Sequence, residues 1–137
     1  MSATDHLDSR VAGALQRAKP LPADVEVLLA QVEAALADTE RELAQANAQA
    51  LDPTSTSAVI ASARGVTFDA QFRLQRLVVA RDRLVEKLAS ATERVEKEAR
   101  EREHAEISAE RDAVTERLLE VYRRAAGEIA DALAARR

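Results

Sequence analysis

The fold of this chain is decided by residues 22–51, PADVEVLLAQVEAALADTERELAQANAQAL, and by the LDPT string (51–54) that follows. Apolar or small residues recur in 22–51 at intervals of four and three, which is the spacing of a heptad seam on one helix face. The seam residues are Val25, Leu29, Val32, Leu36, Thr39, Leu43, Ala46 and Ala50. The pattern predicts one helix from Pro22 to about Leu51 that packs along a partner helix.

The LDPT string predicts a short connection to a second helix. Asp52 is expected to cap that helix with its carboxylate, and Pro53 to occupy its first position, where a missing N–H costs nothing. A connection this short makes the flanking helices antiparallel neighbours. A seam of residues spaced by three and four then runs from Ile60 to Val95, and Gly65 lies within the predicted helix. These features predict an antiparallel helical hairpin.

The remaining segments extend this hairpin at both ends. Residues 1–19 have sparse apolar positions that suit a short leader helix, which Pro20 and Pro22 separate from the hairpin. Residues 93–112 are mostly charged, and an apolar face returns after them. A break within 99–108 would allow the last helix to fold back into a three-helix bundle. No Gly or Pro marks such a break, so we expect a long, extended second arm.

The predicted fold class is therefore all-α: a helical hairpin with an extended coiled-coil second arm and a short N-terminal helix. The predicted segments are 1–19 (leader helix), 20–51 (first heptad helix), 52–98 (second hairpin helix) and 99–137 (charged spacer and C-terminal amphipathic helix).

The composition argues against an enzyme. Three Gly and three Pro in 137 residues are too few for most turn-rich β folds, and the absence of Cys excludes disulfides and thiolate chemistry. The glycines are isolated, so no phosphate-binding loop is present. Glu101 and His104 have the spacing of a di-iron ligand pair, but one pair supplies too few ligands. We predict no catalytic residue, no metal ligand and no cofactor.

The apolar seams supply candidate core and self-association residues. In an extended arm, the apolar face after residue 112 has no partner within the chain, so oligomerisation or another protein must bury it. We therefore expect a protein partner, either a second copy or a component of a larger assembly. The candidate seam residues are Leu29, Val32, Leu36, Leu43, Leu74, Leu77, Leu84, Leu88, Val114, Leu118, Val121, Ile129 and Leu133.

The few aromatic residues allow two interpretations. Phe68, Phe72 and Tyr122 fill gaps in the core, or they anchor a partner protein, since aromatic residues dominate interface hot spots. The helix between Phe68 and Val85 is apolar on more than one side, which is typical of a helix with two neighbours. The candidate partner-binding residues are Phe68, Phe72, Val79 and Tyr122.

A basic stretch raises the question of nucleic acid. It contains Arg64, Arg73, Arg76, Arg81 and Arg83, and it resembles a surface that could follow a phosphate backbone. The net charge is −4 and no aromatic stacks or basic tail accompany the stretch, so pairing with carboxylates of the first helix is the favoured interpretation. No membrane association is expected, because no apolar run approaches the length of a membrane helix and the N-terminus is polar.

Several short strings resemble a known group of proteins. They are ALDP (50–53), FRLQRL (72–77), RDRL (81–84), AERDAV (109–114) and EVY (120–122). The chain is similar in them to short, uncharacterised coiled-coil proteins encoded in phage and prophage clusters of GC-rich bacteria. The late Tyr of that group is often followed by Pro, whereas Arg123 follows Tyr122 here.

The resemblance implies a phage-associated setting, in the bacterial cytoplasm or in a phage particle, and it transfers no active site. Taken with the helical surfaces, it suggests a non-enzymatic structural or assembly protein. Two alternatives stay open: a nucleic-acid-associated packaging or regulatory factor that uses the Arg64 to Arg83 face, and a small cytoplasmic adaptor.

Overall fold

The computed structural model describes residues 2–136, and all regular secondary structure in that range is helical. The helices are α1 (Ala3–Gln16), α2 (Pro22–Leu51) and α3 (Ser57–Ala135). The chain divides into two compact units, Met1–Glu93 and Arg94–Arg137, and α3 contributes to both. The all-α prediction is confirmed.

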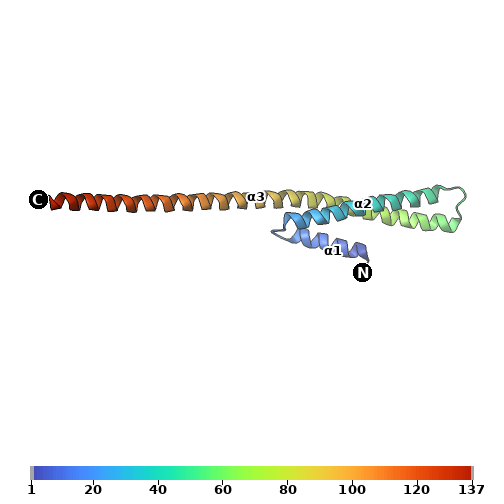
Figure 1. The fold of residues 1–137 in the computed structure, drawn as a ribbon. Helices are drawn as coiled ribbons and strands as arrows, with labels where there is room; N and C mark the ends of the chain where they lie inside the picture. Colours follow the sequence, from blue (N-terminus) through green and yellow to red (C-terminus); the bar gives the residue numbers. More distant parts are fainter. Residues whose placement is uncertain (1, 137) are drawn as a thin grey trace. The chain divides into compact units, whose positions relative to one another are not determined.

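In the first unit, α2 and the beginning of α3 form an antiparallel hairpin (Figure 1). Nη1 of Arg73 lies 3.3 Å from Oε2 of Glu42, and the hydroxyl of Thr67 donates to Oδ1 of Asn47 at 3.3 Å. The contacting residue number rises in α2 as it falls in α3, so the two helices run in opposite directions. The predicted hairpin is thus present.

The hairpin buries its core with a strict seven-residue period. The buried positions spaced by seven are Val25, Val32, Thr39 and Ala46 in α2, and Ala63, Ala70, Leu77, Leu84 and Ala91 in α3. This period is the one that keeps a single face of each helix turned towards its partner in a coiled coil. The heptad reading of both helices therefore identifies the buried face.

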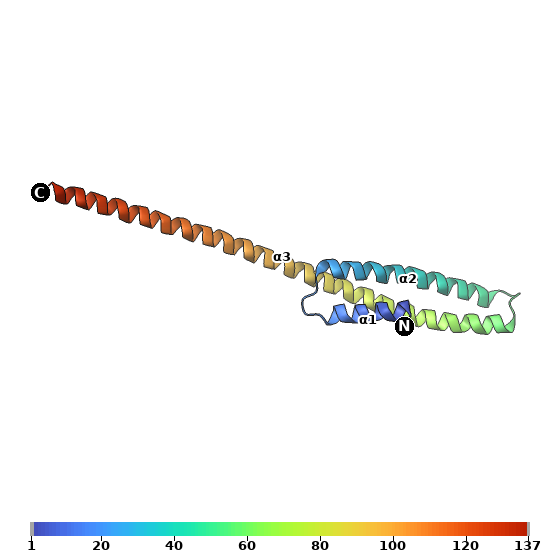
Figure 2. The same cartoon turned by 60° about the horizontal axis from the view of Figure 1, so that its bottom comes forward.

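Side-chain size divides this core into two parts. Towards the turn the buried residues are small, as Ala46, Ala63 and Ala70 show, and only α2 and α3 meet there. At the other end the core contains larger residues such as Val25, Val32 and Leu84, and it includes α1, which Figure 2 shows alongside the hairpin. Its buried members are Val11, Ala14, Val25, Leu28, Val32, Leu36, Leu77 and Leu84.

Hydrogen bonds stabilise both ends of the leader helix α1. At its start, the Ser2 hydroxyl accepts from the Asp5 N–H at 3.3 Å, and the Asp5 carboxylate accepts from the Ser2 N–H at 3.0 Å. This reciprocal capping box satisfies two backbone donors. Near its end, Nζ of Lys87 on α3 donates to the carbonyl of Leu15 at 3.3 Å. A lysine at a helix C-terminus also complements the helix dipole.

The α2 seam differs from the prediction at one position. Leu28 is buried at 6% exposure, whereas the predicted Leu29 is only half-buried against the core. Leu28 and Ala14 line the same hollow between α1 and α2. The helix α1 therefore covers Leu28. A seam predicted from the packing of only two helices does not include this position.

The start of α3 also differs from the prediction. Asp52 does not cap α3, and Pro53 is not its first residue, since α3 begins at Ser57. The Asp52 carboxylate accepts instead from the backbone N–H of Thr54 at 2.8 Å, while the Ser55 N–H donates to the Asp52 carbonyl at 3.1 Å. Pro53 lies inside this turn, where its fixed φ is favourable. Thr56 supplies the cap, because its hydroxyl accepts from the Val59 N–H at 3.4 Å.

The turn predicts a pH effect with a defined sign. The backbone N–H of Thr54, and then its hydroxyl, hold the pKa of Asp52 below its ordinary value of 3.8. A lowered pKa in the folded state means that this stabilisation is complete above pH 3.8 and is lost as the pH falls through the folded pKa. We expect Asp52→Ala to lower the Tm of the first unit slightly at pH 7. Melting curves should show that this difference from the wild type shrinks below the ordinary pKa. An unchanged difference would contradict the assigned role of the carboxylate.

The second unit is the C-terminal part of α3. The helix continues without interruption to Ala135, so there is no break in 99–108, at Gly127 or after Tyr122. Between Val95 and Arg136, every side chain except the half-buried Ser108 is exposed. The uninterrupted helix agrees with the extended-arm interpretation in this respect, since the break within 99–108 that the fold-back alternative needs is absent.

Candidate protein-interaction surfaces

The most conspicuous exposed feature is an apolar stripe on the second unit. Its large side chains are 49–73% exposed, and it spans residues 107–133, about 40 Å of helix at 1.5 Å per residue. We call it the C-terminal stripe. Its members are Ile107, Val114, Leu118, Leu119, Val121, Tyr122, Ile129 and Leu133. Contiguous apolar surface of this kind marks an interaction site in a folded protein.

Several members of the C-terminal stripe are 11 residues apart, namely Ile107, Leu118 and Ile129, and also Tyr122 and Leu133. Eleven residues correspond to three turns of 3.67 residues, close to the 3.6 of an undistorted helix, so such residues lie above one another along one face. Ile107, Val114 and Val121 are also seven residues apart, and both spacings occur in the hairpin core as well. The spacing therefore places the stripe residues along one side of α3.

Charged residues flank the beginning of the stripe asymmetrically. At about 98° per residue, Glu103, Glu106 and Glu110 lie on one side of the line through Ile107. Arg100 and Arg111 lie on the other side of that line, with Lys97 further round the same flank. All of these side chains are exposed, and Lys97 also lies 4.0 Å from Glu101 on its own helix. One flank is thus acidic and the opposite flank is basic.

A second exposed surface lies between α1 and α3 in the first unit. It is an open groove of about 400 Å³. Its apolar lining comes from Val11, Ala12 and Leu15 of α1, and from Phe72, Val79 and Ala80 of α3. Asp8 and Arg76 at its rim form an ion pair with an N–O distance of 3.2 Å. We call this surface the α1–α3 groove.

The structure places the predicted partner-binding residues on both surfaces. Phe72 and Val79 line the α1–α3 groove, Phe68 is exposed about one turn before Phe72, and Tyr122 belongs to the C-terminal stripe. The three aromatic side chains are at least 60% exposed, so the alternative that they fill the core of this chain is wrong.

The predicted seam residues are buried or half-buried in the first unit and exposed in the second. Val32, Leu36, Leu77 and Leu84 are buried, and Leu29, Leu74 and Leu88 are half-buried against the same core. Leu43 is half-buried nearer the turn. The predicted seam residues of the second unit are all exposed, namely Val114, Leu118, Val121, Ile129 and Leu133. Self-association through them stays a prediction.

Most arginines of the basic stretch are paired. Arg73 contacts Glu42 of α2, Arg76 contacts Asp8 of α1, and Nη2 of Arg81 lies 3.1 Å from Oδ1 of Asp82. Three of the five cations thus have carboxylates beside them, which reduces the positive field that a phosphate backbone needs. The favoured interpretation, pairing with α2, holds for Arg73, whereas the other two arginines find their partners elsewhere.

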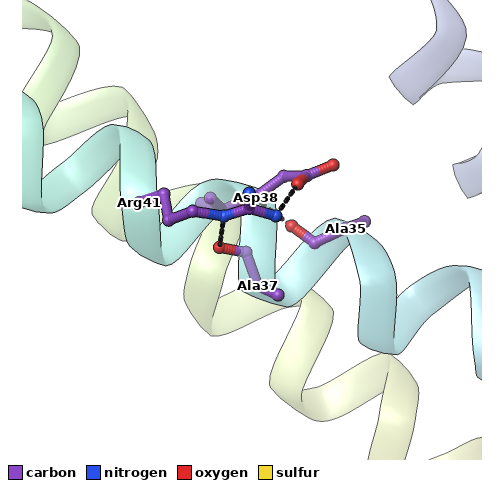
Figure 3. Close-up of polar contacts among 5 residues, drawn as sticks. Ala35, Ala37, Asp38 and Arg41 are labelled. Atoms are coloured by element: carbon purple, nitrogen blue, oxygen red, sulfur yellow. Dashed lines mark hydrogen bonds and ion pairs between the residues drawn. The ribbon is translucent and has the colours of Figure 1, made fainter.

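Arg41 and Thr39 of α2 make their polar contacts within the helix. The guanidinium of Arg41 lies back along α2, where it pairs with Asp38 and donates to the carbonyl of Ala37 (Figure 3). On the buried face, the hydroxyl of Thr39 donates to the carbonyl of Ala35 at 2.7 Å. This hydrogen bond explains how the polar Thr39 occupies a heptad core position.

Residues 2–136 show no cluster of three or more His, Asp or Glu side chains that could hold a metal ion. Within the same range, no helix is apolar enough over a sufficient length to cross a membrane. Glu101 and His104 are both exposed on the second unit.

The sequence did not reveal three structural residues. Leu28, Thr56 and Lys87 contribute a core contact, a helix cap and a contact to the end of α1. The 11-residue spacing within the C-terminal stripe was visible in the sequence and could have been found by counting intervals. Comparison of the chain with known protein families, with curated proteins and with solved structures finds no match.

Proposed function

We propose that this chain is a non-enzymatic helical assembly protein that acts through protein–protein contacts. The observation that carries the proposal is the exposed C-terminal stripe. The first unit, in contrast, buries its own seam. Exposure of eight large apolar side chains to water is costly, because each would gain about 1.5–3 kcal/mol from full burial. A helix that keeps such a face along seven turns is suited to bind another helix.

The setting we propose is a phage or prophage, with the protein in the bacterial cytoplasm or in a phage particle. The resemblance of the ALDP, FRLQRL and RDRL strings to phage-encoded coiled-coil proteins supports this part of the proposal. The acidic net charge and the paired arginines favour a protein partner over nucleic acid.

Two measurements test the assembly function together. Sedimentation of the purified chain over a concentration series measures self-association, and mass spectrometry of purified particles from the encoding strain detects incorporation. We expect at least one to be positive. A chain that is monomeric at every concentration and absent from particles would overturn the proposal.

The α1–α3 groove favours a second candidate function, that of a small adaptor. Phe72 and Val79 are exposed around an apolar floor and would anchor a helix or an extended segment of another protein. An adaptor of this kind loses partner binding on Phe72→Asp and keeps it on Leu118→Glu. An assembly protein that acts through the C-terminal stripe shows the reverse.

A further inference from the structure

We infer that the C-terminal stripe binds the same stripe of a second copy of the chain, and that the two helices run parallel and in register. This inference rests on the proposed assembly function and names its partner and geometry. It is argued from the length of the stripe and from the charges on its flanks.

The length and the flanks of the stripe favour a second copy as the occupant. Two helices remain in contact over a long distance only when their apolar faces follow the same supercoil, which the sequence period determines. A second copy supplies a face with the same residue spacing and the same length as the stripe. It also supplies a basic flank for the acidic flank of the stripe, and an acidic flank for its basic flank.

The flanking charges favour the parallel orientation. In a parallel in-register pair, opposite flanks of the two helices face each other, so at the beginning of the stripe the acidic flank meets the basic flank on both sides. In an antiparallel pair, identical flanks meet, and Glu106 and Glu110 would face acidic residues such as Glu128 on the same flank of the partner. Charges beside a coiled-coil seam are the feature that sets orientation.

Two specific contacts follow from the parallel register. In such a pair, a residue on one flank faces a residue of the second copy that lies on the opposite flank and has a number about five higher. Glu106 then faces Arg111 of the second copy, and Arg117 faces the ring of Tyr122. The first contact is an ion pair and the second is a cation–π contact. The two contacts are 11 residues apart, which is also the spacing of Ile107, Leu118 and Ile129.

Single cysteines test the orientation directly, because the chain contains none of its own. We expect Ile129→Cys to form a disulfide-linked dimer under mild oxidation, since residue 129 faces its own copy in a parallel pair. The matched control is Ala109→Cys, on the opposite face of the same helix, which should stay monomeric on a non-reducing gel. An Ile129→Cys chain that crosslinks only when mixed with Ile107→Cys is antiparallel and overturns the inference. Equal crosslinking of the Ala109→Cys control also overturns it.

Charge reversal tests the flanks without cysteine chemistry. Glu106→Arg and Arg111→Glu should each raise the dimer dissociation constant about tenfold at low salt, and the double variant should restore it. Glu116→Arg, on the opposite face, controls for the change in net charge. A double variant as weak as either single variant contradicts the Glu106–Arg111 contact and the register.

These outcomes separate the inference from the proposed function. If the chain self-associates but the cysteines report another orientation, only the inference fails. If the chain is monomeric yet present in particles, a different protein covers the stripe, and again only the inference fails. A chain that is both monomeric and absent from particles overturns both.

Discussion

Leu84→Ala is expected to lower the free energy of unfolding of the first unit by about 3 kcal/mol. Leu84 is completely buried, at 0% exposure, in the part of the core where α1, α2 and α3 meet. Removal of its isobutyl group forfeits hydrophobic burial and leaves a cavity that three packed helices cannot easily close. Urea denaturation followed by far-UV circular dichroism measures the change.

The neighbouring residue provides a matched control. Val85 lies one position further on the same helix and is 49% exposed. Val85→Ala should change the free energy of unfolding by less than about 1 kcal/mol, because much of its side chain is already in water. Equal losses from the two substitutions would contradict the heptad register that the structure assigns to α3.

The hairpin was predictable because two kinds of signal agree in residues 22–95. The seven-residue period determines which face of each helix is buried, and the LDPT string interrupts the pattern between two long runs. Both signals are local, so they can be read along the chain. The burial of Val32, Leu77 and Leu84 follows from period alone.

Leu28 and the cap of α3 were not predictable in the same way. Leu28 is buried because α1 packs beside α2, and the seam of α2 does not encode where α1 lies. Asp52-Pro53 suits either a helix start or a turn, since Asp accepts from nearby N–H groups in both. The hydrogen bond from Thr54 stabilises the turn, and Thr56 is then the next residue able to cap α3.

The candidate surfaces depend on information that lies beyond the local pattern. An apolar face after residue 112 was predictable, but its exposure required knowing that α3 continues as one helix to Ala135. The same applies to Phe72 and Val79, whose groove exists only because Val11 and Leu15 of α1 form its other side. Surfaces created by packing between distant segments are therefore the least accessible to sequence reasoning.

The second large effect is expected in amide hydrogen exchange of residues 107–133. A single helix without tertiary contacts has little resistance to opening, because most helical stability in proteins comes from a packed apolar face. Exchange in this segment should therefore slow as the protein concentration rises, since association buries the C-terminal stripe. Amides around the buried Leu77 and Leu84 should exchange slowly at every concentration.

Leu118→Glu should remove this concentration dependence. Leu118 lies at the centre of the C-terminal stripe, between Ile107 and Ile129, so each dimer would bury two unpaired carboxylates in place of two leucines. Burial of an apolar side chain of this size from each copy corresponds to a loss in affinity of more than about 100-fold. Ala109→Glu adds the same charge on the opposite face and should exchange like the wild type. Protection of 107–133 that is unaffected by dilution and by Leu118→Glu would mean that the helix persists alone, and that its apolar face needs no partner.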